Sequence, residues 1–178
     1  MGYKIVLTGG PSTGKTTIIE QLDALGYICK HEISRQITRQ GQKDGIDQLF
    51  LKDPLAFSKA LFEGRKRQYD QTDNHEKAPV FFDRGLPDIV AYMDYLGESA
   101  PQSFFKDITH MRYDLVFIFP PWKAIHISDN ERYESFEQGQ KIYQHILSRY
   151  QNLDYDPIEV PEGNVNDRIE FILKFLRS

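Results

Sequence analysis

The sequence has only one cysteine, Cys29, among its 178 residues. One cysteine cannot form a disulfide within the chain and offers no cysteine-based metal site. Long apolar runs are also missing, because the longest, 115–119, is far shorter than the roughly 20 residues that cross a bilayer. The first residues carry no basic region, apolar stretch or cleavage site of an export signal. We therefore expect a protein of a reducing compartment, the cytoplasm, with no membrane span.

Basic residues are neither abundant nor clustered. The 22 Lys and Arg residues against 26 Asp and Glu residues leave a formal charge of -4, and no basic block is present. This distribution argues against nucleic acid as the main partner. The composition, 40% hydrophobic and 27% charged, is that of an ordinary globular protein, and the length predicts a single domain over 1–178.

Short apolar segments alternate with segments of helical period along the chain. This alternation predicts an α/β fold built from βαβ units around a mostly parallel sheet. The expected strands are 4–8, 27–31, 80–83, 114–119 and 158–160. The expected helices are 15–25, 53–69, 87–97, 134–150 and 166–176. Their limits come from turn and cap residues such as Gly26, Asp53 with Pro54, and Gly97.

A phosphate-binding loop motif occupies residues 9–16. The segment fits G-x-x-x-x-G-K-[ST] in full and lies between an apolar strand and an amphipathic helix. Glycines let backbone N–H groups turn toward an anion, and the positive end of the following helix faces the same place. We therefore predict a nucleoside triphosphate site. Its residues are Gly9, Gly10, Pro11, Ser12, Thr13, Gly14, Lys15, Thr16 and Thr17.

The last residues of this motif suit Mg²⁺-dependent phosphate chemistry. Lys15 is expected to reach the β and γ phosphates, and the Thr16 hydroxyl is expected to bind Mg²⁺. ATP is the default nucleotide; GTP stays open, although no guanine-reading N-K-x-D string occurs. The alternative is a glycine-rich turn with an exposed lysine, which the flanking pattern disfavours.

An acidic residue and an arginine end the third expected strand. Ligands of open parallel sheets bind beyond the carboxyl ends of the strands, where Asp83 and Arg84 fall. Asp83 could hold Mg²⁺ through water or accept a proton from a substrate hydroxyl. Arg84 could bind a phosphate with two hydrogen bonds. The alternative is a surface ion pair or a helix cap near Asp88, and the strand-end placement favours function.

The second expected strand ends at His31 and Glu32, and Arg35 follows three residues later. On a helix, this spacing would place Glu32 and Arg35 on one face. We expect Glu32 to contact substrate hydroxyls or Mg²⁺ and Arg35 to contact a phosphate, with a plain ion pair as the alternative. His31 is expected to be solvated or hydrogen-bonded and not catalytic.

A polar stretch, 128–135, leads into the helix expected at 134–150. In phosphoryl transfer, an arginine from a closing segment can neutralise charge on the transferred group while closure excludes water. Arg132 is the candidate for this role; the alternative is an exposed arginine in the first helical turn. The loop at 161–165 is placed to touch the nucleotide base, but its composition also suits a plain turn.

The chain resembles P-loop kinases and ATPases of the nucleoside and nucleotide kinase type. More narrowly, it is similar to the AAA-labelled, NadR-like family that includes the ribosylnicotinamide kinase domain. The likeness covers nearly the whole chain, and the segments that carry it are GGPSTGKT at 9–16, HEISR at 31–35, FFDRGLPDIVAY at 81–92, VFIFPPW at 116–122 and ERYESFE at 131–137.

The resemblance implies a three-layer P-loop NTPase fold with a five-stranded parallel sheet in the order 2-3-1-4-5. It also implies Lys15 and Thr16 for phosphate and Mg²⁺, Asp83 and Arg84 as the Asp-Arg pair of such kinases, and Arg132 in a lid. No segment that we recognise defines a nicotinamide riboside pocket, so the substrate does not follow from it.

The leading hypothesis is a small-molecule kinase that transfers the γ-phosphoryl group of ATP to a nucleoside- or nucleotide-like acceptor. Asp83 or Glu32 would be the base, and the acceptor would lie among Glu32, Arg35 and Arg84. The alternatives are a nucleotide-switched binding module that recruits a protein or lipid, and a simple ATPase or GTPase. Turnover that depends on an acceptor would separate the first from the others. The oligomeric state stays open.

Overall fold

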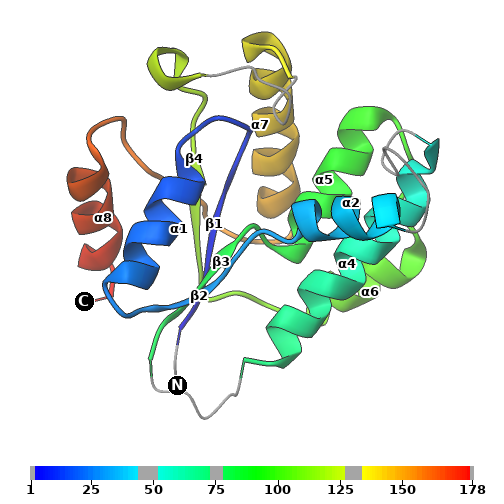
Figure 1. Ribbon diagram of the computed structural model, residues 1–178, viewed down its shortest axis with the longest axis horizontal. Coiled ribbons are helices and arrows are strands. Elements are labelled where there is room, and N and C mark those ends of the chain that lie inside the picture. The colour runs from blue at the N-terminus through cyan, green and yellow to red at the C-terminus, as the bar shows by residue number, and fades with distance from the viewer. Residues whose placement is uncertain (1–2, 44–51, 73–77, 127–133, 177–178) are drawn as a thin grey trace.

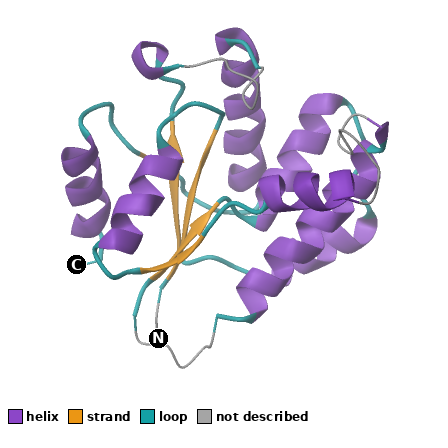
Figure 2. Ribbon diagram, in the orientation of Figure 1, coloured by secondary structure: helices purple, strands orange, loops and turns teal. Residues whose placement is uncertain are grey.

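One parallel sheet forms the centre of the computed structural model, which describes residues 3–43, 52–72, 78–126 and 134–176. The five strands are hydrogen-bonded in the order β2-β3-β1-β4-β5, and every pairing is parallel (Figures 1 and 2). The strands are β1 (Lys4–Gly9), β2 (Ile28–Lys30), β3 (Val80–Asp83), β4 (Leu115–Phe119) and β5 (Ile158–Glu159). The predicted strand number and order are confirmed.

Helices cover both faces of the sheet, which makes the three layers of the predicted fold class (Figure 1). Helices α1 and α8 pack together on one face, while α5 and α7 cover the other. Helices α4 and α6 pack against α5, and α2 packs against α4. The helices are α1 (Lys15–Ala24), α2 (Ser34–Lys43), α4 (Pro54–Asp70), α5 (Leu86–Leu96), α6 (Gln102–His110), α7 (Phe136–Gln151) and α8 (Val165–Lys174), with a short 3₁₀ turn η1 (Lys123–Ile125). Within the described ranges, none of these helices has the length and apolarity of a membrane span.

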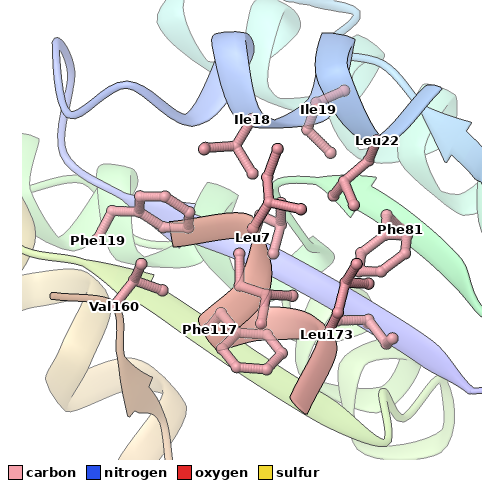
Figure 3. Close-up of a cluster of buried hydrophobic side chains, with 12 residues drawn as sticks. Leu7, Ile18, Ile19, Leu22, Phe81, Phe117, Phe119, Val160 and Leu173 are labelled. Atoms are coloured by element: carbon pink, nitrogen blue, oxygen red, sulfur yellow. The ribbon is translucent and has the colours of Figure 1, made fainter. Parts of the chain in front are cut away.

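The apolar side chains of the central strands form the core on each face of the sheet. Figure 3 shows the cluster on the α1 and α8 side, where Leu7 and Phe117 of the sheet meet Ile18, Leu22 and Leu173 of the helices. Strands β1, β3 and β4 are almost wholly buried, as their continuous apolar sequences predict. The edge strands β2 and β5 are less buried.

Local cap chemistry sets several helix ends where the sequence predicted them. The Asp53 side chain accepts a hydrogen bond from the Ala56 N–H at 2.8 Å, and α4 begins at Pro54. Gly97 ends α5 with φ of 75°, a left-handed conformation that favours glycine. Ser135 and Gln138 cap each other at the start of α7, so this helix begins two residues later than predicted.

Two leucines of the expected helices are exposed, and the helices α2 and α6 are absent from the expected set. Leu25 is 61% exposed because α1 ends at Ala24, and Leu55 is 41% exposed in the first turn of α4. Helix α6 has only nine residues, of which Phe104 and Ile108 are buried. Two buried apolar residues in so short a segment give only a weak helical periodicity in the sequence.

A buried carboxylate, Asp88, joins three elements below the loop that follows β1. It accepts hydrogen bonds from the Thr8 hydroxyl at 2.5 Å, the Gly85 N–H at 2.9 Å and the Tyr150 hydroxyl at 2.7 Å. Thr8, Asp88 and Tyr150 are all fully buried. A buried charge needs such partners, so this network fixes β1, α5 and α7 relative to one another.

Replacing Tyr150 with phenylalanine should lower the free energy of unfolding by about 1–3 kcal/mol. The substitution removes one donor from the buried Asp88 carboxylate and leaves the ring in place. Urea denaturation of Tyr150→Phe, with Tyr3→Phe at an exposed position as the control, measures the effect. Equal stability of the two variants would contradict the role of this network.

Candidate active site

The loop between β1 and α1 has the backbone conformation of an anion site. Gly9, Ser12 and Gly14 have φ angles of 137°, 55° and 85°. A Cβ at Gly9 would lie 2.4 Å from the Phe119 carbonyl oxygen, so the loop leaves the sheet through a gap that only glycine fits. Gly14 precedes α1 and offers no side-chain cap, which leaves the positive end of the helix facing the loop.

Helix α7 closes the loop from the side. A Cβ at Gly10 would lie 2.9 Å from the carbonyl oxygen of Gly139, and Gly139 in turn packs near Pro11. Gly10 is therefore required because two main chains approach each other here, whereas a Cβ at Gly139 would make only ordinary contact with the Pro11 ring, at 3.9 Å.

The Lys15 ammonium group lies inside the loop. It donates to the Gly10 carbonyl oxygen at 2.5 Å and to the Thr13 hydroxyl at 3.0 Å, and the residue is 6% exposed. Burial and the positive charge of Arg84 lower the pKa of Lys15 to about 7, although nearby carboxylates oppose this shift. An anion in the loop would restore the charged form.

Asp83 ends β3 directly beside β1, with Leu7 as its neighbour in register. It is 5% exposed. Burial raises the pKa of Asp83, and the Glu32 carboxylate raises it further against the opposing charges of Lys15 and Arg84. A carboxylate with a raised pKa next to a phosphate loop has the character of a proton acceptor.

Arg84 connects the loop to the neighbouring strand ends. Its φ of 71° lies in the left-handed region, which is uncommon for a residue with a side chain. The guanidinium donates to the Gly9 carbonyl oxygen at 2.9 Å, pairs with Glu32 at 3.0 Å and lies 3.4 Å from Asp88. These contacts hold the side chain across the site and maintain the strained backbone.

Glu32 lies between two guanidinium groups. Arg65 of α4 contacts both of its oxygens, at 3.1 and 3.0 Å, and Arg84 contacts it from the other side. Its Oε1 also accepts from the N–H groups of Ile33 and Ser34. Burial alone would raise the pKa of Glu32, but Arg65 and Arg84 outweigh burial and lower it to about 2. Glu32 is therefore a fixed charge at neutral pH.

Arg65 is a site residue that sequence analysis missed. It is 4% exposed and also donates to the Gly85 carbonyl oxygen at 2.9 Å, so it supports both Glu32 and the turn after β3. The available signal was its spacing, because Arg65 follows Leu61 by four residues and Phe62 by three on the face of α4 that packs inward. A charged residue on a buried face indicates a buried partner.

The other predicted site residues have different outcomes. Helix α2 begins at Ser34, so Glu32 precedes it, and the predicted placement of Glu32 and Arg35 on one helical face is wrong. Arg35 lies in the first turn of α2, but its side chain is outside the described part of the structure. Arg132 also lies outside the described residues, and its predicted lid role stays a prediction.

Two groups beside the loop carry oxygen donors of the kind that Mg²⁺ prefers. They are the hydroxyl of Thr16, an exposed residue in the first turn of α1 with Thr17, and the carboxylate of Asp83. Among the residues that the structure describes, no group of three or more His, Cys, Asp or Glu side chains could hold a metal ion. This donor set fits Mg²⁺ bound largely by phosphate oxygens and water, with one or two protein groups.

Residues 4–168 match the model of a family described as AAA domain. The match spans most of the chain, so the chain belongs to this AAA domain family. No curated protein sequence matches it significantly.

Solved structures with the same fold include several P-loop kinases. Deoxyadenosine kinase from M. mycoides is 21% identical, with a TM-score of 0.68 and coverage of 98% of both chains. The NadR protein is 20% identical with a TM-score of 0.68; the match covers 99% of this chain and 50% of NadR. Thymidylate kinase from Candida albicans is 13% identical with a TM-score of 0.67, covering 99% of this chain and 91% of the kinase. The predicted AAA-labelled family is thus confirmed, and the predicted resemblance to NadR and other P-loop kinases is confirmed for the fold.

Replacing Glu32 with glutamine should destabilise the protein by about 3 kcal/mol at pH 7, because the buried Arg65 and the partly buried Arg84 lose their counter-charge. The folded-state pKa of Glu32 is about 2 against an ordinary 4.5, so its stabilisation is complete above pH 4.5 and is lost as the pH falls toward 2. Urea unfolding of wild type and Glu32→Gln at several pH values should show the difference shrinking over this window.

The control for this experiment is Glu20→Gln, because Glu20 is exposed on α1. It should change stability little at any pH. A Glu32→Gln difference that stays constant down to pH 2.5 would contradict the assigned ion pairs.

Proposed function

We propose that this chain is a Mg²⁺-dependent kinase that transfers the γ-phosphoryl group of ATP to a nucleoside- or nucleotide-like acceptor. The observation that carries the proposal is a group of charged residues next to the phosphate loop, in which Arg65 and Asp83 are buried and Glu32 and Arg84 are partly buried. Binding and hydrolysis of a triphosphate need the loop, but they do not need a second group of charged residues after β2 and β3. An acceptor with hydroxyl or phosphate groups does.

The roles of the residues follow from their surroundings. Lys15 and the loop N–H groups bind the β and γ phosphates. Arg84 neutralises negative charge where the triphosphate faces the acceptor. Asp83 is the preferred base, because its pKa is raised, whereas the pKa of Glu32 is lowered to about 2 by two arginines. Glu32 instead accepts hydrogen bonds from the acceptor and keeps Arg65 and Arg84 in place.

Thr16 and Asp83 would hold Mg²⁺ when it is bound. Bound Mg²⁺ would neutralise part of the phosphate charge. Arg35 and Arg132 are proposed to bind acceptor phosphate and the transferred group, as the sequence predicts.

The structural neighbours define which acceptors to test first. The structures of deoxyadenosine kinase from M. mycoides hold dCMP with dCDP, dATP or dCTP, and those of NadR hold NAD with AMP-PNP, or NR. We therefore propose ATP as the donor, with GTP as the alternative, and a nucleoside, a nucleotide or nicotinamide riboside as the acceptor. The cytoplasm, where ATP and such acceptors occur, is the proposed location.

A panel of nucleosides, nucleotides and nicotinamide riboside with Mg²⁺-ATP tests this function. One acceptor class should stimulate ADP release strongly and appear as a phosphorylated product by mass spectrometry. Asp83→Asn should then lower kcat by about 10²- to 10⁴-fold with little change in ATP affinity.

Three results would count against the kinase or the base. Equal ADP release with and without every acceptor would indicate a simple ATPase, and tight ATP or GTP retention without turnover would indicate a nucleotide-switched binding module. An Asp83→Asn variant with full activity would remove Asp83 as the base. A Mg²⁺ titration of this variant separates the two roles of Asp83, because lost activity that high Mg²⁺ restores indicates metal binding.

Triphosphate affinity should decrease as the pH rises above about 7. Without ligand, the pKa of Lys15 is about 7, and a bound anion raises it, so binding above this pH takes up a proton. Above this pH, the loss of triphosphate affinity approaches tenfold per pH unit. Calorimetry at pH 8 in two buffers of different ionisation enthalpy measures the proton uptake. Lys15→Arg is the control that should abolish the uptake, and no uptake by the wild type would contradict the prediction.

A further inference from the structure

Arg168 of α8 lies against the outer side of the phosphate loop. Its Nη2 donates to the carbonyl oxygen of Thr13 at 3.1 Å, and the residue is 4% exposed. Its Nη1 is so close that a Cβ at Gly14 would lie 2.8 Å from it. The left-handed backbone of Gly14 favours glycine, and a side chain there would also displace this guanidinium.

Two aromatic rings near the carboxyl end of β4 flank the Arg168 guanidinium. Its central carbon lies 4.6 Å from the ring centroid of Phe119 and 5.6 Å from that of Trp122. Planar guanidinium groups are favoured at such distances from aromatic faces. The rings leave the cation little freedom to move away from the loop.

The charge of Arg168 has no ion-pair partner among the residues that the structure describes. Its buried Nε also lacks a hydrogen-bond acceptor there. Burial lowers the pKa of Arg168, and the attraction of Glu162 only partly opposes it. Arg65 and Arg84, in contrast, share Glu32. Burying a cation without a counter-charge is costly, and an apolar side chain would serve better if packing were the only requirement.

The hydrogen bond to Thr13 has a direct effect on the loop. In a trans peptide, the carbonyl oxygen and the following N–H point in opposite directions, and the described chain has no cis peptide bond. An outward Thr13 carbonyl, held by Arg168, therefore turns the Gly14 N–H to the opposite side of the loop.

We propose that Arg168 is a positioning residue for polyphosphate binding, which orients the peptide between Thr13 and Gly14 and adds an unpaired positive charge behind the loop. This role rests on the proposed function, because it requires that the loop binds a triphosphate. It concerns the phosphate groups of the ligand and not its nucleoside part.

The test compares Mg²⁺-ATP with Mg²⁺-tripolyphosphate, which has no nucleoside. Calorimetric titration of Arg168→Gln should show both ligands weakened by a similar factor, about tenfold or more. Arg168→Lys keeps the charge and should recover part of the affinity. With the acceptor identified, Arg168→Gln should raise the KM for ATP and leave the KM for the acceptor unchanged.

The matched control is Arg149→Met. Arg149 is a partly buried arginine of α7 that pairs with Asp94 and lies 5.5 Å from the ring centroid of Phe105, away from the loop. Its loss should leave both affinities unchanged. Thermal unfolding without ligand, measured for each variant, ensures that titrations are made on folded protein.

Several outcomes would overturn the role of Arg168. Unchanged affinities of folded Arg168→Gln would mean that the residue serves only packing. Weaker binding of ATP alone would mean that it acts on the nucleoside part of the ligand. If Arg168→Gln does not fold, Arg168→Lys tests the role instead. Loss of the planar group between the rings should weaken the binding of both ligands about threefold. Unchanged affinities of this variant would overturn the role. A wild-type protein that binds neither ligand would instead overturn the proposed function.

Discussion

The Arg84 guanidinium joins the two halves of the candidate site. It contacts the Gly9 carbonyl oxygen at the entrance of the phosphate loop, Glu32 after β2, and Asp88 in α5. Because one side chain makes all these contacts, it couples the position of the loop to the positions of Glu32 and Asp88. The left-handed backbone at Arg84 is the local cost of this arrangement.

Sheet topology makes this arrangement possible. The order β2-β3-β1-β4-β5 places the ends of β2, β3 and β1 side by side, so Glu32, Asp83 and the loop meet although they are distant in sequence. Asp88 then ties the same region to α7 through Tyr150. The site is therefore supported from the sheet and from the helical layer together.

The sequence predicted those parts of the site that depend on local geometry. The loop follows from a contiguous motif between a strand and a helix, and Asp83 follows from its position at a strand end. Arg65 and Arg168 could not be predicted in the same way, because their partners lie 33 and 155 residues away and only the folded chain brings them together. The expected placement of Glu32 and Arg35 on one helical face failed for a related reason. Local spacing suggested a helix, whereas tertiary contacts with Arg65 and Arg84 determine where Glu32 points.

The close approach of Gly10 and Gly139 limits how this site can evolve. A methyl group at residue 10 would meet main-chain atoms of α7, and main chain cannot give way as a flexible side chain can. Larger residues at position 10 would be tolerated only if α7 shifted as a whole, and α7 also carries Tyr150. Substitutions in the loop are thus coupled to the position of the entire helix.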